Sequence, residues 1–186
     1  MLVLVILVAG CTQSSSAPVS TATPTATAAA QVSAEATTAP AAAVTAQPVN
    51  ETLKNEMVAL AGSLAKKVDK TNFTAAITEG ENSTAFASAL SQFRDFKATD
   101  SRIAYVYTLE QKNGKVNFLI DTDYGNANAA KFRQEYVDAP AEMKKSITGS
   151  IGAGPYTDKW GSFVSGIAPL DLGSNTSVIL VIDARV

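Results

Sequence analysis

The stretch RIAYVYTLEQKNGKVNFLID, Arg102 to Asp121, decides the fold of this protein. Its two halves, RIAYVYTL (102–109) and KVNFLID (115–121), are rich in β-branched and aromatic residues, which favour β-strands. Asn113-Gly114 lies between them, and Asn-Gly is the strongest short signal for a two-residue type I′ turn. The stretch therefore predicts an antiparallel β-hairpin.

Two more strands are expected after the hairpin, at 160–169 (WGSFVSGIAP) and 177–184 (SVILVIDA). The second of these is apolar on both faces, which is typical of a central strand that is covered on both sides. About 40 residues separate the hairpin from Trp160, and they predict only one short helix, near Ala141 to Ile147. So long a connection in a compact domain usually has a functional role.

Two helices are expected before the hairpin. Asn50 is expected to cap the first, because apolar residues follow it at steps of three and four. The second is predicted from about Ser83 to Phe96. The order of elements predicts an α+β domain built on an antiparallel sheet. The apolar positions are Leu53, Met57, Leu60, Ala61, Leu64 and Val68 in the first helix and Phe86, Leu90 and Phe93 in the second.

The composition excludes several classes of function. The chain of 186 residues has a formal net charge of −2, so no basic excess attracts nucleic acid, and no nucleic-acid partner is expected. It contains no histidine, which excludes Ser-His-Asp and Cys-His catalytic groups and removes the commonest metal ligand. The sequence therefore favours a binding protein over an enzyme, with no metal and no cofactor.

The first eleven residues, MLVLVILVAGC, have features of an export signal. The apolar run from Met1 to Ala9 would span roughly 14 Å as a helix, which is too short to cross a bilayer. It fits the apolar region of a signal peptide. Val8-Ala9-Gly10-Cys11 resembles the lipobox of prokaryotic lipoproteins, in which the cysteine becomes the lipid-bearing N-terminus. The alternative is an ordinary signal sequence that happens to contain a cysteine, and no Lys or Arg precedes the apolar run.

Residues 12–49 consist almost wholly of Ala, Thr, Ser, Pro, Val and Gln, and Glu35 is their only charge. Such a segment lacks the bulky apolar side chains that offset the entropy of folding. It is therefore expected to be a disordered stalk between a lipid on Cys11 and a folded domain at 50–186. This arrangement predicts a protein anchored to the extracytoplasmic face of the cell membrane.

The segments YVYTL, NGKVNFLIDTD, GPYTDKWGSFVSGIAPL and VILVIDA together resemble an extracytoplasmic Cache domain, the PAS-like sensor module of prokaryotic receptors. The likeness covers roughly residues 50–186. It implies that a long N-terminal helix packs on one face of an antiparallel sheet, and that a loop region closes a small-molecule pocket over the other face. Cache domains usually sit between two membrane helices, whereas this chain stops at Val186 after its last expected strand. We therefore expect it to pass its state or ligand to a membrane receptor or transporter.

The resemblance places the end of the second strand, the long connection and the approach to Trp160 around the pocket. Carboxylates such as Asp158 or Asp183 could pair with a ligand ammonium, and Trp160 could add a cation–π contact. Lys159 or Arg133 could instead bind a carboxylate. The expected ligand is a small polar metabolite: an amino acid, an amine or a small carboxylate. The candidate residues are Tyr107, Asp121, Tyr124, Tyr156, Asp158, Trp160 and Asp183.

These residues could also have purely structural roles. A tryptophan at a strand start is often part of a core, and Asp158-Lys159 could be a solvated turn. Two functions remain at this point. One is a lipid-anchored, sensor-type binding module of Cache type. The other is a surface or adhesion lipoprotein whose PAS-like domain has a filled core and works through protein contacts.

Overall fold

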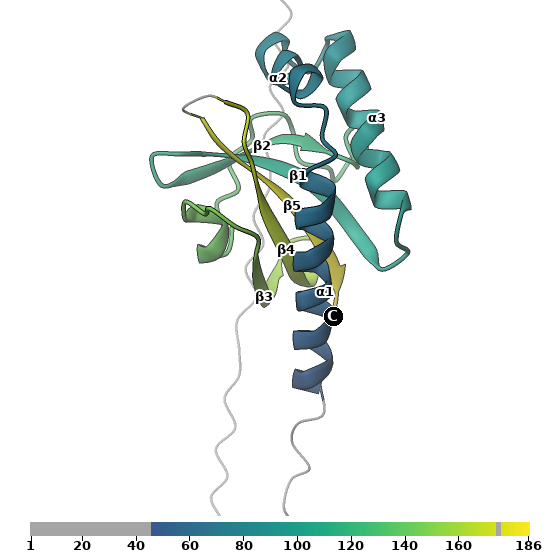
Figure 1. Ribbon diagram of the computed structural model, residues 1–186, viewed down its shortest axis with the longest axis vertical. Coiled ribbons are helices and arrows are strands. Elements are labelled where there is room, and N and C mark those ends of the chain that lie inside the picture. The colour runs from purple at the N-terminus through teal and green to yellow at the C-terminus, as the bar shows by residue number, and fades with distance from the viewer. Residues whose placement is uncertain (1–45, 174–175) are drawn as a thin grey trace, which may run out of the picture. The chain divides into compact units, whose positions relative to one another are not determined.

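The computed structural model describes residues 46–173 and 176–186, so the expected signal peptide at 1–11 and most of the expected stalk lie outside the described residues (Figure 1). The helices and strands are α1 Ala46–Ala65, α2 Lys70–Glu79, α3 Thr84–Ala98, β1 Ile103–Lys112, β2 Lys115–Asp121, a short 3-10 helix η1 Ala141–Lys144, β3 Ile151–Asp158, β4 Gly161–Leu170 and β5 Ser177–Arg185.

The strands form one five-stranded antiparallel sheet in the order β2-β1-β5-β4-β3. This confirms the predicted α+β class. β5 is the middle strand, and it is buried from Val178 to Ala184, as its unbroken apolar sequence predicts. The strands at 160–169 and 177–184 are also confirmed to within a residue or two.

The β1–β2 hairpin forms as predicted, because Asn113 and Gly114 both adopt positive φ, at 54° and 74°. This is the left-handed pair that a type I′ turn requires. Further along, Leu109 pairs with Phe118 but Tyr107 pairs with Asp121, so two residues of β2 lie opposite one residue of β1. This β-bulge turns Asp121 to the same face of the sheet as Tyr107.

The two faces of the sheet bury different side chains, since successive residues of a strand point to opposite sides. In β5, Leu180 and Ile182 belong to the apolar cluster under the helices. Ile179 and Val181 belong to a second cluster on the other face. Asp183 continues this alternation, so its carboxylate is directed to the face that carries no α-helix.

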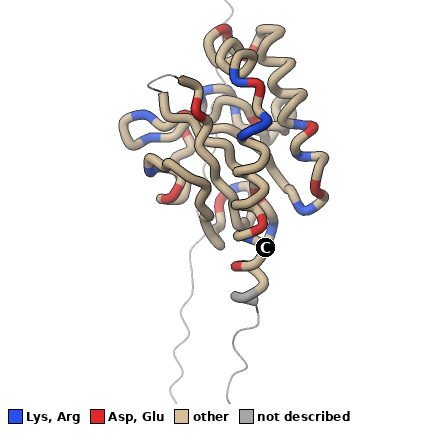
Figure 2. Tube along the Cα trace, in the orientation of Figure 1, with Lys and Arg blue, Asp and Glu red and all other residues tan. Residues whose placement is uncertain are grey.

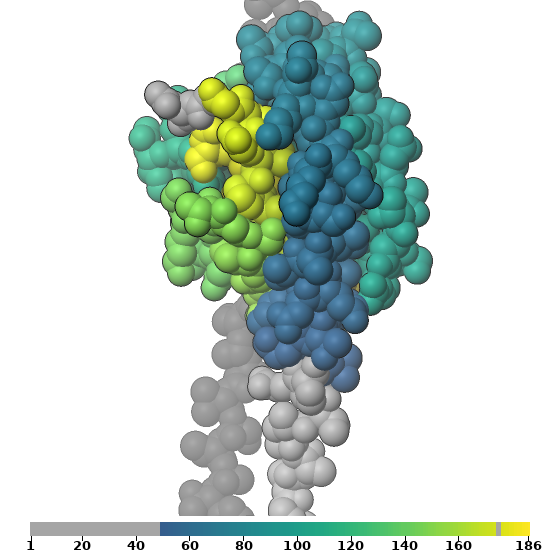
Figure 3. Space-filling view, viewed as in Figure 1, coloured from purple at the N-terminus to yellow at the C-terminus, as the bar shows by residue number. Residues whose placement is uncertain are grey.

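Helices α1 and α3 cover one face of the sheet side by side, α1 over β3, β4 and β5 and α3 over β1 and β2. In the space-filling view α1 forms a ridge between the strands and α3 (Figure 3). The backbones of α1 and β4 approach closely at Gly166, where an added Cβ would lie 2.0 Å from the carbonyl oxygen of Met57. A glycine is therefore needed for this helix to lie on this strand.

The predicted helices are present, with differences at their ends. Helix α3 begins after Ser83, whose side chain accepts a hydrogen bond from the backbone N–H of Phe86, and its predicted apolar residues are buried. The prediction that Asn50 caps the first helix is wrong, since α1 begins at Ala46. Pro48 does not prevent this earlier start, because proline is tolerated in the first turn of a helix. Val68 is buried, as expected, but lies beyond the end of α1.

Two elements were not predicted from the sequence. Helix α2 is capped by Asp69, which accepts the backbone N–H of Asn72, but it is short and only weakly amphipathic. Strand β3 has the sequence IGAGPYTD. It was not predicted because glycine and proline are uncommon in strands. It is an edge strand, and its pairing with β4 is interrupted between Ala153 and Tyr156. The long connection is consequently shorter than expected, and its predicted helix is the single 3-10 turn η1.

Charged residues of both signs are interspersed along the Cα trace rather than separated into two regions (Figure 2). Within the part of the chain that the structure describes, no helix is both long and apolar enough to span a membrane.

Candidate functional site

A cavity of about 270 Å³ opens on the face of the sheet opposite the helices. The strands β1, β2, β4 and β5 form its floor, and the segment 123–129, Tyr136 and the β3–β4 turn form its walls. The residues that line it are Tyr105, Tyr107, Phe118, Asp121, Asp123, Asn126, Ala127, Asn128, Ala129, Tyr136, Asp158, Trp160, Phe163 and Asp183.

One side of the cavity is an aromatic wall. The rings of Phe118 and Tyr136 are stacked with centroids 5.1 Å apart, and the ring of Trp160 packs edge-on against both at 5.6 Å. The indole Nε1–H of Trp160 donates to the carbonyl oxygen of Asn128 at 2.8 Å. Trp160 therefore joins the β3–β4 turn to the loop across the cavity, and its ring is held in one orientation.

The deepest polar group of the cavity is Asp183, whose side chain is only 3% exposed. Its Oδ1 accepts hydrogen bonds from the hydroxyl groups of Ser165 at 2.6 Å, Tyr156 at 3.3 Å and Tyr107 at 3.4 Å. Burial raises the pKa of the Asp183 carboxyl to about 7. Burial also raises the pKa of the Tyr107 and Tyr156 hydroxyl groups, so both remain neutral donors at physiological pH.

Asp158 lies at the end of β3 and is held by two donors. Its Oδ1 accepts the backbone N–H of Trp160 at 2.8 Å, and its Oδ2 accepts a short hydrogen bond from the hydroxyl group of Tyr136. Burial is the main reason that the pKa of Tyr136 is raised, and the neighbouring Tyr156 and Asp158 add to it. The nearby Asp158 carboxylate also raises the pKa of Asp183.

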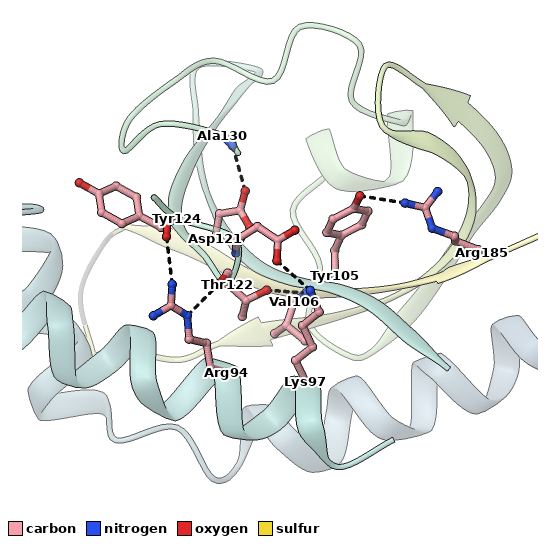
Figure 4. A network of polar contacts seen from close by, with 10 residues as sticks. Arg94, Lys97, Tyr105, Val106, Asp121, Thr122, Tyr124, Ala130 and Arg185 are labelled. Atoms are coloured by element: carbon pink, nitrogen blue, oxygen red, sulfur yellow. Dashed lines mark hydrogen bonds and ion pairs between the residues drawn. The ribbon is translucent and has the colours of Figure 1, made fainter. Parts of the chain in front are cut away.

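The loop after β2 forms the opposite wall, and it is held by hydrogen bonds within the loop and by contacts from α3 (Figure 4). Asp121 accepts the backbone N–H groups of Asp123 and Ala130, both at 2.9 Å, and closes the loop on itself. From α3, Lys97 forms an ion pair with Asp123 at 2.8 Å. Arg94, also on α3, donates to the carbonyl oxygens of Thr122 at 3.0 Å and Tyr124 at 2.9 Å. Burial raises the pKa of Asp121.

Two cations stand beside the cavity without lining it. Arg185 donates to the hydroxyl group of Tyr105 at 2.9 Å (Figure 4). It also donates to the carbonyl oxygen of Trp160 at 3.2 Å, and its guanidinium lies over the Tyr105 and Phe163 rings. Lys97 lies over the same Tyr105 ring, 5.3 Å from its centroid. Both cations therefore already have partners within the protein.

The structure brings together five of the seven residues that the sequence nominated, namely Tyr107, Asp121, Asp158, Trp160 and Asp183. Tyr156 lies behind the cavity, where its hydroxyl group meets Ser165 at 2.9 Å. Tyr124 does not line the cavity. Its ring packs 5.1 Å from Phe86 under the helices, and its hydroxyl group donates to Glu81.

The two cations nominated for a ligand carboxylate also lie elsewhere. Lys159 folds over the ring of Trp160, with its Nζ 4.1 Å from the ring centroid. Arg133 donates to the carbonyl oxygen of Ile77, and its guanidinium lies over Phe132. Neither residue lines the cavity.

Several lining residues were missed from the sequence. Tyr105 could have been predicted, because it lies two positions before the candidate residue Tyr107 and therefore on the same face of β1. Phe163 lies in the same way two positions before Ser165 on β4. Phe118 follows from the hairpin register, which pairs it with Leu109. Tyr136 lies in a connection without periodicity, so no pattern in the sequence indicated it.

In the described ranges, no three His, Cys, Asp or Glu side chains are grouped so that they could hold a metal ion. Comparison with known protein families finds no family model that matches the sequence, and no curated protein matches it either.

Proposed function

We propose that this protein is a lipid-anchored, extracytoplasmic module that binds a small polar metabolite in the cavity over its sheet. The observation that carries this proposal is the cavity itself, about 270 Å³ in volume and lined by aromatic rings and carboxylates. Binding sites for small molecules are usually mostly apolar pockets with a few fixed polar groups, and this cavity has that composition.

The arrangement of the domain supports a Cache (PAS-like) type. A long N-terminal helix, α1, lies on one face of an antiparallel sheet, and the connection after β2 closes a pocket on the other face. Both features were expected from the resemblance. The proposed role is that of a sensor rather than an enzyme, since the sequence provides no nucleophile paired with a base.

A lipid on Cys11 would hold the protein at one leaflet of the membrane. We therefore propose that it acts through a separate membrane partner, a receptor or a transporter. The alternative is a surface or adhesion protein that works by protein contacts with a filled core. The cavity favours the ligand-binding role, because the alternative expects a filled core on this face of the sheet.

Binding is tested by thermal unfolding of the protein with a library of amino acids, amines and small carboxylates. A ligand at about one hundred times its Kd stabilises the folded state by about 2.7 kcal/mol, which raises Tm by several degrees. Ala129→Leu fills part of the cavity and should abolish the shift, because Ala129 lines it and is half-buried. The matched control is Ala141→Leu at an exposed position of η1. Equal shifts in both variants would place the ligand outside the cavity.

Cys11→Ser should prevent lipid attachment and release the protein from the membrane fraction or leave it unprocessed. A thiol is required for the thioether to lipid, and stable anchoring needs two hydrocarbon chains. Fractionation of native cells followed by mass spectrometry of the N-terminus checks this. A variant that stays in the membrane fraction at the mature mass of the wild type would contradict the proposed anchor.

A further inference from the structure

The described charged side chains that line the cavity are all negative. Among the described residues that line it are four aspartates, at 121, 123, 158 and 183, and no lysine or arginine. Asp123 is neutralised by its ion pair with Lys97. Asp121 is satisfied by two backbone N–H groups of its own loop. Asp158 likewise accepts two hydrogen bonds, from the backbone of Trp160 and from Tyr136. Among the described lining aspartates, Asp183 is therefore the one that has neither an ion pair nor a donor on each oxygen.

Asp183 has one carboxylate oxygen that is fully used and one that is open. All three hydroxyl donors reach Oδ1, whereas Oδ2 takes no hydrogen bond from any residue that the structure describes. The side chain is 3% exposed and borders the cavity. No buried side-chain oxygen of the described residues lacks a hydrogen-bond partner, so the unbonded Oδ2 is accessible from the cavity and can accept a donor from outside the protein. A ligand in the cavity would therefore lie next to Asp183.

The groups that face Asp183 from each neighbouring strand supply no countercharge. β1 presents Tyr105 and Tyr107, β4 presents Ser165, and β3 presents Tyr156 together with Asp158.

From the loop, Tyr136 contributes a hydroxyl group that is bound to Asp158. Arg185 lies two positions along β5, but it is directed to the Tyr105 hydroxyl group and the Trp160 carbonyl oxygen. Asp183 accordingly forms no ion pair with any described residue.

We infer that the ligand of this cavity is a small organic cation, an ammonium ion with an apolar group, and that its capture displaces a proton from Asp183. This inference rests on the proposed binding function and narrows its ligand. The ammonium N–H would donate to Oδ2 of Asp183, with Asp158 nearby. The apolar group would pack against the rings of Phe118, Tyr136 and Trp160. The π faces of these rings would also attract the positive charge of the ligand. The proton leaves the Asp183 carboxyl for the solvent, and the cation takes its place.

The exchange makes binding depend on pH. Below its pKa of about 7, Asp183 is protonated in the empty cavity, so the cation must expel a proton in order to bind. Affinity should then rise about tenfold for each pH unit up to that pKa and change little above it. A neutral or anionic ligand would show no such rise.

The test uses calorimetric titration of the full chain with two matched sets of probes. One set is benzylammonium, benzyl alcohol and phenylacetate, and the other is butylammonium, butanol and pentanoate. We expect the ammonium ions to bind best, with affinity about one hundredfold higher at about pH 8 than at about pH 5. Repeating the titration at about pH 6 in two buffers of different ionisation enthalpy should show release of nearly one proton for each ligand bound.

Asp183→Asn should weaken ammonium binding at least about tenfold at about pH 8 and remove its pH dependence. The matched control is Asp138→Asn, at an exposed aspartate outside the cavity, which should leave both unchanged. The inference is overturned if neither ammonium ion binds, if either binds no better than its alcohol, or if binding survives Asp183→Asn with its pH dependence intact. Binding of a neutral or anionic compound at the cavity would then leave the proposed function standing. A library that gives no ligand at all would end both proposals.

Discussion

Asp183→Asn is expected to raise the free energy of unfolding by about 4 kcal/mol at about pH 8, because it removes a buried charge that forms no ion pair with any described residue. The folded protein holds the Asp183 proton up to a pKa of about 7, whereas the unfolded chain releases it near the ordinary value of 3.8. Between these two values the folded state binds more protons, so its stability falls as the pH rises. Asparagine cannot ionise, and its amide can still meet the hydroxyl groups of Ser165 and Tyr156.

The size of the effect should itself depend on pH. At about pH 4, Asp183 is protonated in the folded state and only partly ionised in the unfolded chain, so the variant and the wild type should differ by less than about 1 kcal/mol. Urea unfolding at about pH 4 and about pH 8 measures the two differences, with Asp138→Asn as the exposed control. A variant that is no more stable than the wild type at about pH 8 would show that the ionised Asp183 is stabilised inside the folded protein. That result would remove the reason for a cation to enter the cavity.

Gly166→Ala is expected to lower the free energy of unfolding by more than about 3 kcal/mol, which is the upper end of the usual cost of overpacking a core. The added Cβ would lie 2.0 Å from the carbonyl oxygen and 2.2 Å from the carbonyl carbon of Met57. These are backbone atoms of α1, so no change of side-chain rotamer relieves the clash. The helix would have to move away from β4, which would loosen the core between them.

The matched control is Gly149→Ala, since a Cβ at Gly149 meets no atom within 4 Å. It should change the stability by less than about 0.5 kcal/mol. Urea unfolding followed by circular dichroism measures both variants. A Gly166→Ala protein that unfolds within about 1 kcal/mol of the wild type would mean that α1 does not rest on β4 at this point.

The sequence predicted most of the fold because its signals are local. The Asn113-Gly114 turn, the strands around it and the periodic apolar residues of α3 depend on neighbours a few positions away, and all are present. The elements that were missed have weak local signals. Strand β3 contains Gly152, Gly154 and Pro155, so only its pairing with β4 makes it a strand.

The candidate site was only partly predictable. Asp158, Trp160 and Asp183 are charged or aromatic residues in or next to predicted strands, and the structure places all three around the cavity. Tyr124 has the same kind of side chain but points to the helices, because the chain turns after Asp121 and α3 binds the loop from the other side. No pattern along the sequence records which way a side chain in a loop points.

By itself, the sequence determined the α+β class, the hairpin, the buried central strand and the exclusion of histidine-dependent chemistry. These follow from residue types and from periods of two and 3.6 along the chain. Only the tertiary structure decided that the carboxylates of β3 and β5 meet at one cavity, that Tyr136 completes its wall, and that Asp183 forms no ion pair with the residues the structure describes. The reason is physical: the register between strands and the path of the loop set those distances, and both arise from contacts between residues far apart in the sequence.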